Sequence, residues 1–115
     1  MTSPMSVFLI EGNVEIYLSR LHTTWNPEER DKLLCLLVRE EAQMGFGREH
    51  LENAQRRVSD GRDRIARQRR LVDDIPLPER VSAPDALLLE TLEKTQLLLE
   101  ENLMALQRGW ENRKF

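Results

Sequence analysis

Apolar residues recur every three or four positions along most of this chain, which is the spacing of amphipathic α-helices. A first helix is predicted from Asn13, with these residues on its apolar side: Val14, Tyr17 or Leu18, Leu21 and Trp25. The next stretch, NPEE, is typical of a helix start, because Asn26 can cap the following amides and Pro27 suits the first turn. One side of this second helix carries Leu33, Leu37 and Met44, widened by residues 34–36 and 38. Residues 13–44 are therefore predicted to form a short helical hairpin.

Two long helices are predicted in the remainder of the chain. The segment GFG at residues 45–47 favours a bend or a break, and the pattern leaves open whether the helix continues through it. A helix follows over about residues 48–75 and ends at the prolines of IPLPERVSAPD, since proline cannot continue the hydrogen-bond ladder. The loop is placed near residues 76–82. Ser82 can cap the last helix within an S-x-x-D box, and this helix extends to about Trp110.

Each long helix carries a seam of residues at alternating steps of three and four, which is the heptad pattern of a coiled coil. The two seams are Leu51, Ala54, Val58, Gly61, Ile65, Gln68, Val72 and Ile75, and Leu89, Leu92, Gln96, Leu99, Leu103, Leu106 and Trp110. The short connection makes the helices antiparallel, and the seams meet when facing residue numbers sum to 157. That register pairs Val58 with Leu99 and Gly61 with Gln96. The predicted fold is all-α: the short hairpin, then a long antiparallel coiled-coil-like hairpin over residues 48–110, in one domain of residues 1–115.

Seven arginines lie within residues 50–74, a density that raises the question of nucleic-acid binding. In the register above, four of them face the last helix: Arg62 opposite Glu100, Arg69 opposite Glu93, Arg57 opposite Asn102 and Arg64 opposite Thr95. The other three, Arg56, Arg67 and Arg70, point outward and are interleaved with acids. Because the whole chain carries a net charge of −3, a solvated, salt-bridged helix face is favoured. A small nucleic-acid-associated regulator that uses Arg56, Arg67 and Arg70 is the alternative.

Length and composition narrow the class of protein. The 115 residues are 40% apolar and 32% charged, as in helix-rich globular proteins. The apolar run at residues 7–10 is too short for a signal peptide or a membrane span. The single cysteine, Cys35, lies in an apolar run, cannot form an internal disulfide and suits a reducing compartment. We therefore expect a cytoplasmic protein with no membrane attachment.

No arrangement of reactive side chains predicts catalysis or cofactor binding. His22 and His50 lie outside the spacing of metal-binding motifs and are expected at the surface. Glu40 and Glu41 could approach His50, but adjacent residues on a helix point about 100° apart and make a poor pair of ligands. We therefore expect no catalytic residue, no cofactor and no metal. An enzyme or a metal protein ranks last among the hypotheses.

Four segments carry a resemblance to a known group of proteins. They are NVEIYLSRL, NPEERDKLLCLLVREEAQM, EHLENAQRRVSDGRDRIARQRRLVDD and LLLETLEKTQLLLEENLMAL. Together they resemble the two halves of small uncharacterised all-helical proteins of alphaproteobacteria. In the second half, the family has an Arg-rich helix with a G-x-x-R-I-x-x-Q core, seen here from Gly61 to Gln68, then a loop and a leucine-rich helix. The loop IPLPERVSAPD departs from the usual shorter polar turn. The resemblance implies a bacterial, cytoplasmic, all-α protein and brings no activity with it.

The last helix has more apolar surface than a single partner helix can cover. Besides its seam it carries Leu87, Leu88, Leu97, Leu98 and Met104. The short hairpin can cover part of this surface, and a second subunit is expected to cover the rest. The leading hypothesis is a non-enzymatic protein–protein interaction or structural module that forms a homodimer or docks on another protein. Nucleic acid and membrane are not expected partners.

Overall fold

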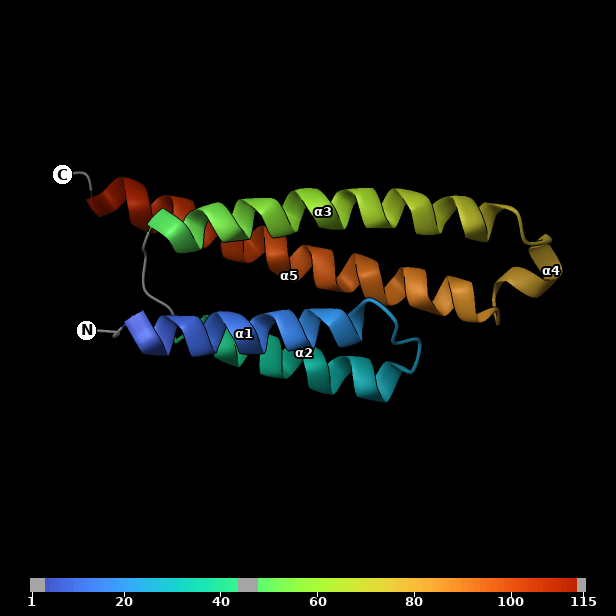
Figure 1. Cartoon of the computed structure of the whole chain (residues 1–115). Helices are drawn as coiled ribbons and strands as arrows, with labels where there is room; N and C mark the ends of the chain where they lie inside the picture. The colour runs from blue at the N-terminus through green and yellow to red at the C-terminus, as the bar shows by residue number, and fades with distance from the viewer. Residues whose placement is uncertain (1–3, 44–47, 114–115) are drawn as a thin grey trace.

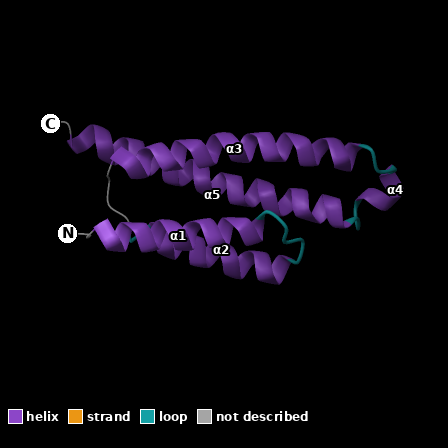
Figure 2. Cartoon of the chain, in the orientation of Figure 1, coloured by secondary structure: helices purple, strands orange, loops and turns teal. Residues whose placement is uncertain are grey.

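The computed structural model describes residues 4–43 and 48–113, and all regular elements within these ranges are α-helices (Figure 2). They are α1 (Pro4–Leu21), α2 (Pro27–Glu41), α3 (Arg48–Asp73), α4 (Leu77–Arg80) and α5 (Pro84–Arg113). Helices α1 and α2 form a short hairpin, and α3 and α5 lie side by side as a long hairpin with α4 at its turn (Figure 1). The predicted all-α architecture is confirmed.

Helix α1 begins earlier than predicted, at Pro4 rather than Asn13. Ile10 is 7% exposed and continues the apolar side of Val14 and Leu18 by one more turn, so the helix extends toward the N-terminus. Gly12 does not interrupt it. Trp25 was predicted on the same apolar side, but it follows the end of α1 and is 54% exposed. The helical period does not apply beyond the last turn, which explains this error.

Helix α2 begins as the NPEE stretch predicts. The side chain of Asn26 accepts hydrogen bonds from the amides of Glu28 and Glu29 at 2.9 and 3.3 Å, and Pro27 is the first helical residue. Leu33 and Leu37 are buried on the predicted side, while Cys35 is exposed rather than packed in the apolar run. Met44 and the bend predicted at residues 45–47 lie outside the described residues.

The seam between α3 and α5 has the predicted register. Gln96 Nε2 donates to the carbonyl of Val58 at 2.9 Å, and a Cβ atom added at Gly61 would lie 1.9 Å from Gln96 Oε1. Flanking ion pairs join Arg62 to Glu100 at 3.0 Å and Arg69 to Glu93 at 3.9 Å, as expected. The glycine therefore lets the buried Gln96 side chain lie directly against the α3 backbone.

The turn of the long hairpin contains α4 within the predicted loop. Arg80 Nη2 donates to the carbonyls of Ile75 and Asp73 at 2.8 and 3.1 Å, so it satisfies carbonyls at the end of α3 and just beyond it. Ser82 was predicted to cap α5, but the helix begins at Pro84 and the carbonyl of Ala83 accepts from the amide of Leu87. The helix start is therefore one residue later, because Pro84 takes the first helical position.

The short hairpin lies along the part of the long hairpin that is nearest to the chain ends (Figure 1). One apolar core is shared by both hairpins and contains Ile10, Val14, Leu18, Leu21, Leu33, Leu37, Val58 and Leu99. The ion pair of Arg30 with Glu90, at 3.4 Å, joins the first turn of α2 to α5. Beyond it, toward α4, the apolar residues Leu71, Leu77 and Val81 are 53%, 72% and 85% exposed. The short hairpin therefore covers only part of the long one.

Candidate functional site

Arg57 joins the long hairpin to the short one. It lies on α3, is 6% exposed, and donates through Nε and Nη2 to Glu15 Oε1 at 3.1 and 3.0 Å. Its Nη2 also donates to Glu11 Oε2. Both carboxylates belong to α1, so the prediction that Arg57 faces Asn102 on α5 is wrong. The α3–α5 register fixes only the seam, and Arg57 turns instead toward the two acids of the helix that docks beside it.

The ionisation of Glu11 and Arg57 follows from this contact. Burial alone would raise the pKa of Glu11, but hydrogen bonds from His50 and Arg57 and the charge of Arg57 outweigh it and lower the pKa to about 2. Burial likewise disfavours the charged form of Arg57, yet its bonds to Glu11 and Glu15 raise its pKa. Because the folded-state pKa of Glu11 lies below its ordinary 4.5, its ionised form stabilises the fold above pH 4.5, and this contribution is lost as pH falls toward 2.

His50 belongs to the same contact, although it was predicted at the surface. It is 5% exposed, and its Nδ1 lies 3.0 Å from Glu11 Oε1. The prediction is wrong because α1 extends over the beginning of α3 and covers this histidine. The histidine therefore connects the first turn of α3 to the same carboxylate that Arg57 binds.

Three buried polar atoms in this region have no hydrogen-bond partner among the described residues: Glu41 Oε1, His50 Nε2 and Arg57 Nη1. Glu41 lies at the end of α2 and is 8% exposed. Burial is the main reason that the pKa of Glu41 is raised to about 7. The positive charge of Arg57 opposes this rise, and the negative charge of Glu11 adds to it. A buried acid without a partner destabilises the fold when it ionises.

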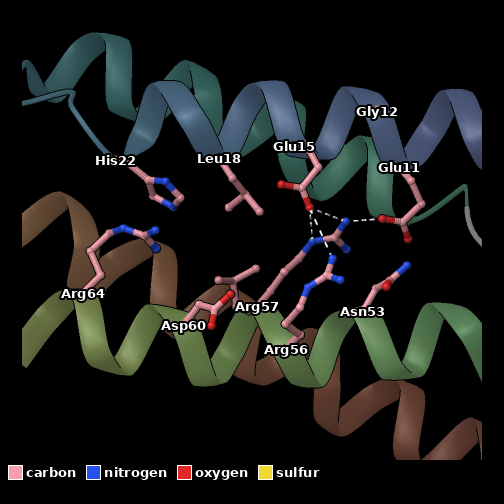
Figure 3. Close-up of a pocket in the computed structure, with 11 residues that line it drawn as sticks. Glu11, Gly12, Glu15, Leu18, His22, Asn53, Arg56, Arg57, Asp60 and Arg64 are labelled. Atoms are coloured by element: carbon pink, nitrogen blue, oxygen red, sulfur yellow. Dashed lines mark hydrogen bonds and ion pairs between the residues drawn. The ribbon is translucent and has the colours of Figure 1, made fainter.

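A cleft of 480 Å³ separates α1 from α3 beside Arg57 (Figure 3). Leu18 and Leu99 supply apolar lining, and Figure 3 shows Arg64 of α3 pointing at one end toward His22, which directly follows α1. His22 is half-buried, and burial together with the positive charge of Arg64 lowers its pKa to about 4. His22 is therefore neutral at pH 7. Arg64 lines this cleft rather than facing Thr95, whose hydroxyl donates instead to the carbonyl of Thr91 at 2.8 Å.

The chemistry available in this cleft is limited. Glu15 engages both Arg57 and Arg56, the latter at 4.0 Å, so these charges largely neutralise one another. Within residues 4–43 and 48–113 no group of three His, Cys, Asp or Glu side chains is placed to hold a metal ion. The arrangement joins helices and holds His22 neutral, and it does not pair a nucleophile with a base.

The arginines of the nucleic-acid alternative do not form one patch. Arg56 is 61% exposed and lines the cleft near Glu15. Arg67 and Arg70 are exposed on α3 and form no ion pair with any residue that the structure describes. Asp63 lies on the same side of α3 four residues before Arg67, and Asp74 follows Arg70 by four residues, just beyond the end of the helix. Acidic groups therefore interrupt the positive charge.

The five apolar residues predicted for interaction divide between two faces of α5. Leu87, Leu88 and Leu98 are half-buried. Leu98 lines a small hollow together with Val38 of α2 and Ala42, which follows α2. Leu97 and Met104 are 61% and 56% exposed, seven residues apart on one side of α5. Leu97 lines a groove formed only by residues of α3 and α5. We call this side, defined by Leu97 and Met104, the open face of α5.

The acid–arginine contact between α1 and α3 could not be found from the seam pattern. Glu11 and Glu15 lie four residues apart and share one side of a helix, but the predicted start at Asn13 left Glu11 outside it. An earlier helix start would have placed both acids together. The pairing with Arg57 depends in addition on how the hairpins dock, which local spacing does not specify.

Comparison with known proteins finds no matching family model, no similar curated protein and no similar solved structure. Among the helices described here, none is both long enough and apolar enough to cross a bilayer.

Proposed function

We propose that this protein is a non-enzymatic interaction module that self-associates through the open face of α5. The observation that carries the proposal is the exposure of Leu97 and Met104, at 61% and 56%, on a long helix whose other side is already covered. Two large apolar side chains on one stripe lose contact with water when a partner covers them, which favours association. The charged groups around them, Glu93 and Glu100, give the stripe the polar border that interfaces have.

Sedimentation or light scattering at tens of micromolar tests this proposal. We expect the wild type to be a dimer and Leu97→Glu to be a monomer, because a charge in the centre of an apolar contact would be buried without a partner. Ile16→Glu is the matched control: Ile16 is 52% exposed, but it lies on α1. A monomeric wild type would contradict the proposal, and so would equal effects of the two substitutions.

The nucleic-acid alternative has less support than self-association. Arg67 and Arg70 are exposed, but Asp63 and Asp74 border them and the chain carries a net charge of −3. We expect no submicromolar binding of duplex DNA at physiological salt. Fluorescence anisotropy with a labelled duplex checks this, and binding that Arg67→Gln weakens would reverse the ranking.

A reducing location fits the same proposal. Cys35 is free and exposed on α2, where an oxidising compartment would promote disulfides between copies. We propose the cytoplasm as the site of action.

A further inference from the structure

The cleft between α1 and α3 ends at a guanidinium group that no acid binds. Arg64 is half-buried and forms no ion pair or hydrogen bond with any residue that the structure describes. Its side chain points toward His22, which is neutral at pH 7 because burial and the charge of Arg64 lower its pKa to about 4 (Figure 3). Withdrawing a cation from water costs free energy that a counter-charge normally offsets. This end of the cleft is therefore suited to an anionic group.

The other charges that line the cleft are mostly bound to one another. Both of its glutamates bind Arg57, and Arg56 lies 4.0 Å from one of them. The third acid is Asp60, four residues before Arg64 on α3, and it forms no ion pair with a described residue. Asp60 is exposed whereas Arg64 is half-buried, so water screens the charge of the acid more strongly. The positive charge of Arg64 is therefore the least compensated charge in the cleft.

The walls beside this cation are apolar. Leu18 and Leu99 line the cleft, are 3% and 5% exposed, and belong to the core that the two hairpins share. The carbonyl of Leu18 accepts from the amide of His22 at 2.9 Å, so the apolar wall and the polar end are one helical turn apart. The cleft measures 480 Å³, within the range of about 300 to 1,000 Å³ of sites that hold small organic molecules.

We propose that this cleft binds a small organic monocarboxylate with an apolar chain. Arg64 donates two parallel hydrogen bonds to the carboxylate, and a ring N–H of the neutral His22 can donate a third. The chain lies against Leu18 and Leu99. A phosphate ester brings a second negative charge, which Asp60 and the glutamates of the cleft would repel, so a carboxylate is the better fit. This site is separate from the open face of α5 and does not depend on self-association.

Hexanoate and hexanamide are matched probes, because they share one chain and differ in charge at pH 7. Isothermal titration calorimetry should give a dissociation constant of about 1 mM or below for hexanoate. Hexanamide should bind about tenfold more weakly, since it lacks the charge-assisted bonds to Arg64. Acetate keeps the charge and lacks the chain, and it should also bind at least about tenfold more weakly than hexanoate.

Three substitutions locate the carboxylate. Arg64→Gln should abolish the preference for hexanoate over hexanamide, and circular dichroism should show an unchanged fold because no described ion pair is lost. Arg67→Gln is the matched control: Arg67 is exposed on α3 and does not line the cleft, so the preference should persist. Asp60→Asn should tighten the binding of hexanoate by about twofold to fivefold, because it removes an acid that repels the carboxylate.

Nuclear magnetic resonance places the ligand independently of affinity. The chain has two histidines, and only His22 lines the cleft. At pH 7 the ring signals of His22 should shift as hexanoate is added, while those of the buried His50 stay in place.

Each contrary outcome overturns a defined part of the proposal. No binding of hexanoate at about 10 mM contradicts the site as a whole. Equal binding of hexanoate and hexanamide contradicts an anionic ligand, and a preference that survives Arg64→Gln contradicts the assignment to Arg64. Tighter binding of hexyl phosphate than of hexanoate contradicts the choice of a carboxylate. All of these results leave self-association through α5 untouched.

Discussion

The long helix α3 makes two contacts of opposite character. Toward α5 it presents a continuous seam, with Ala54, Val58 and Gly61 against a helix whose axis runs beside it for its full length. Toward α1 it presents polar side chains, and Arg57 spans the distance to Glu11 and Glu15 beside an open cleft. The first contact is made by apolar area, and in the second the buried Arg57 binds the half-buried Glu11 and the exposed Glu15.

The difference lies in how each contact responds to a single substitution. Apolar packing is divided over many side chains, so each contributes a part of the stability. The charge network is concentrated in one buried cation, and its removal takes the main partner from both carboxylates. We therefore expect one substitution, at Arg57, to disrupt most of the α1–α3 contact. A single substitution in the α3–α5 seam should remove only part of the stability of that seam.

The largest effect is expected from Arg57→Leu. Removing the guanidinium leaves the half-buried Glu11 with His50 as its main remaining partner and takes two hydrogen bonds from the exposed Glu15, which should cost about 3 kcal/mol of unfolding free energy at pH 7. Denaturant unfolding measures the total. Hydrogen exchange should show protection lost in α1 before α3, and equal loss in both helices would contradict a contact that serves mainly to join the hairpins.

A gain of similar size is expected from Glu41→Gln at alkaline pH. The folded-state pKa of Glu41, about 7, lies above its ordinary 4.5, so the wild type loses stability as pH rises from 4.5 through 7 and stays destabilised above that range. The variant should be more stable than the wild type by about 3 kcal/mol at pH 8 and nearly equal to it at pH 4. Glu11 and His22 titrate in both proteins, so their contributions cancel in the difference in stability between the variant and the wild type.

The matched control for that substitution is Glu40→Gln. Glu40 accepts a hydrogen bond from Asn13 Nδ2 at 2.9 Å, and a glutamine keeps an oxygen for this bond. Thermal unfolding at pH 4 and pH 8 should show a pH-dependent gain for Glu41→Gln alone. A gain that is the same at both pH values would mean that the pKa of Glu41 in the folded protein is not raised above its ordinary value.

Gly61→Leu tests the seam and should destabilise by about 1 to 3 kcal/mol through overpacking. Gln96 must move, because a Cβ atom at residue 61 would lie 3.0 Å from its Cδ and nearer still to Oε1. Gly61→Ala should lose less, since the better helix propensity of alanine, about 1 kcal/mol, opposes the loss. Gly12→Ala is the control: nothing lies within 4 Å of its Cβ position, so it should gain stability. Higher stability of Gly61→Leu would mean that the seam has slack at this point.

The smallest effect is expected from Arg62→Leu. Its ion pair with Glu100 is as short as the bonds of Arg57, at 3.0 Å, but the two side chains are 67% and 36% exposed. Solvent screening limits such a pair to less than about 1 kcal/mol. Chemical denaturation measures the unfolding free energies of Arg62→Leu and Arg57→Leu side by side. An equal loss of unfolding free energy in the two variants would contradict the difference between the two contacts.

The sequence predicted the seam well because its period and its turn are local properties. Once α3 and α5 are antiparallel, the facing of Gly61 and Gln96 and of Arg62 and Glu100 follows from residue numbers alone. The burial of His50 and Glu41 depends on the angle at which one hairpin docks on the other, and no repeat in the sequence encodes that angle. The same docking decides that Leu98 is covered while Leu97 is not.

Arg57 joins segments that are far apart along the chain, 42 residues for Glu15 and 46 for Glu11. Each hairpin closes a much shorter loop, and closing a shorter loop costs less chain entropy. The two hairpins should therefore form first, with their attachment as the last event of folding. Added salt should then slow this last phase in stopped-flow refolding, because it screens the attraction of the still-exposed Arg57 for the acids of α1, and should leave the earlier formation of the hairpins nearly unchanged.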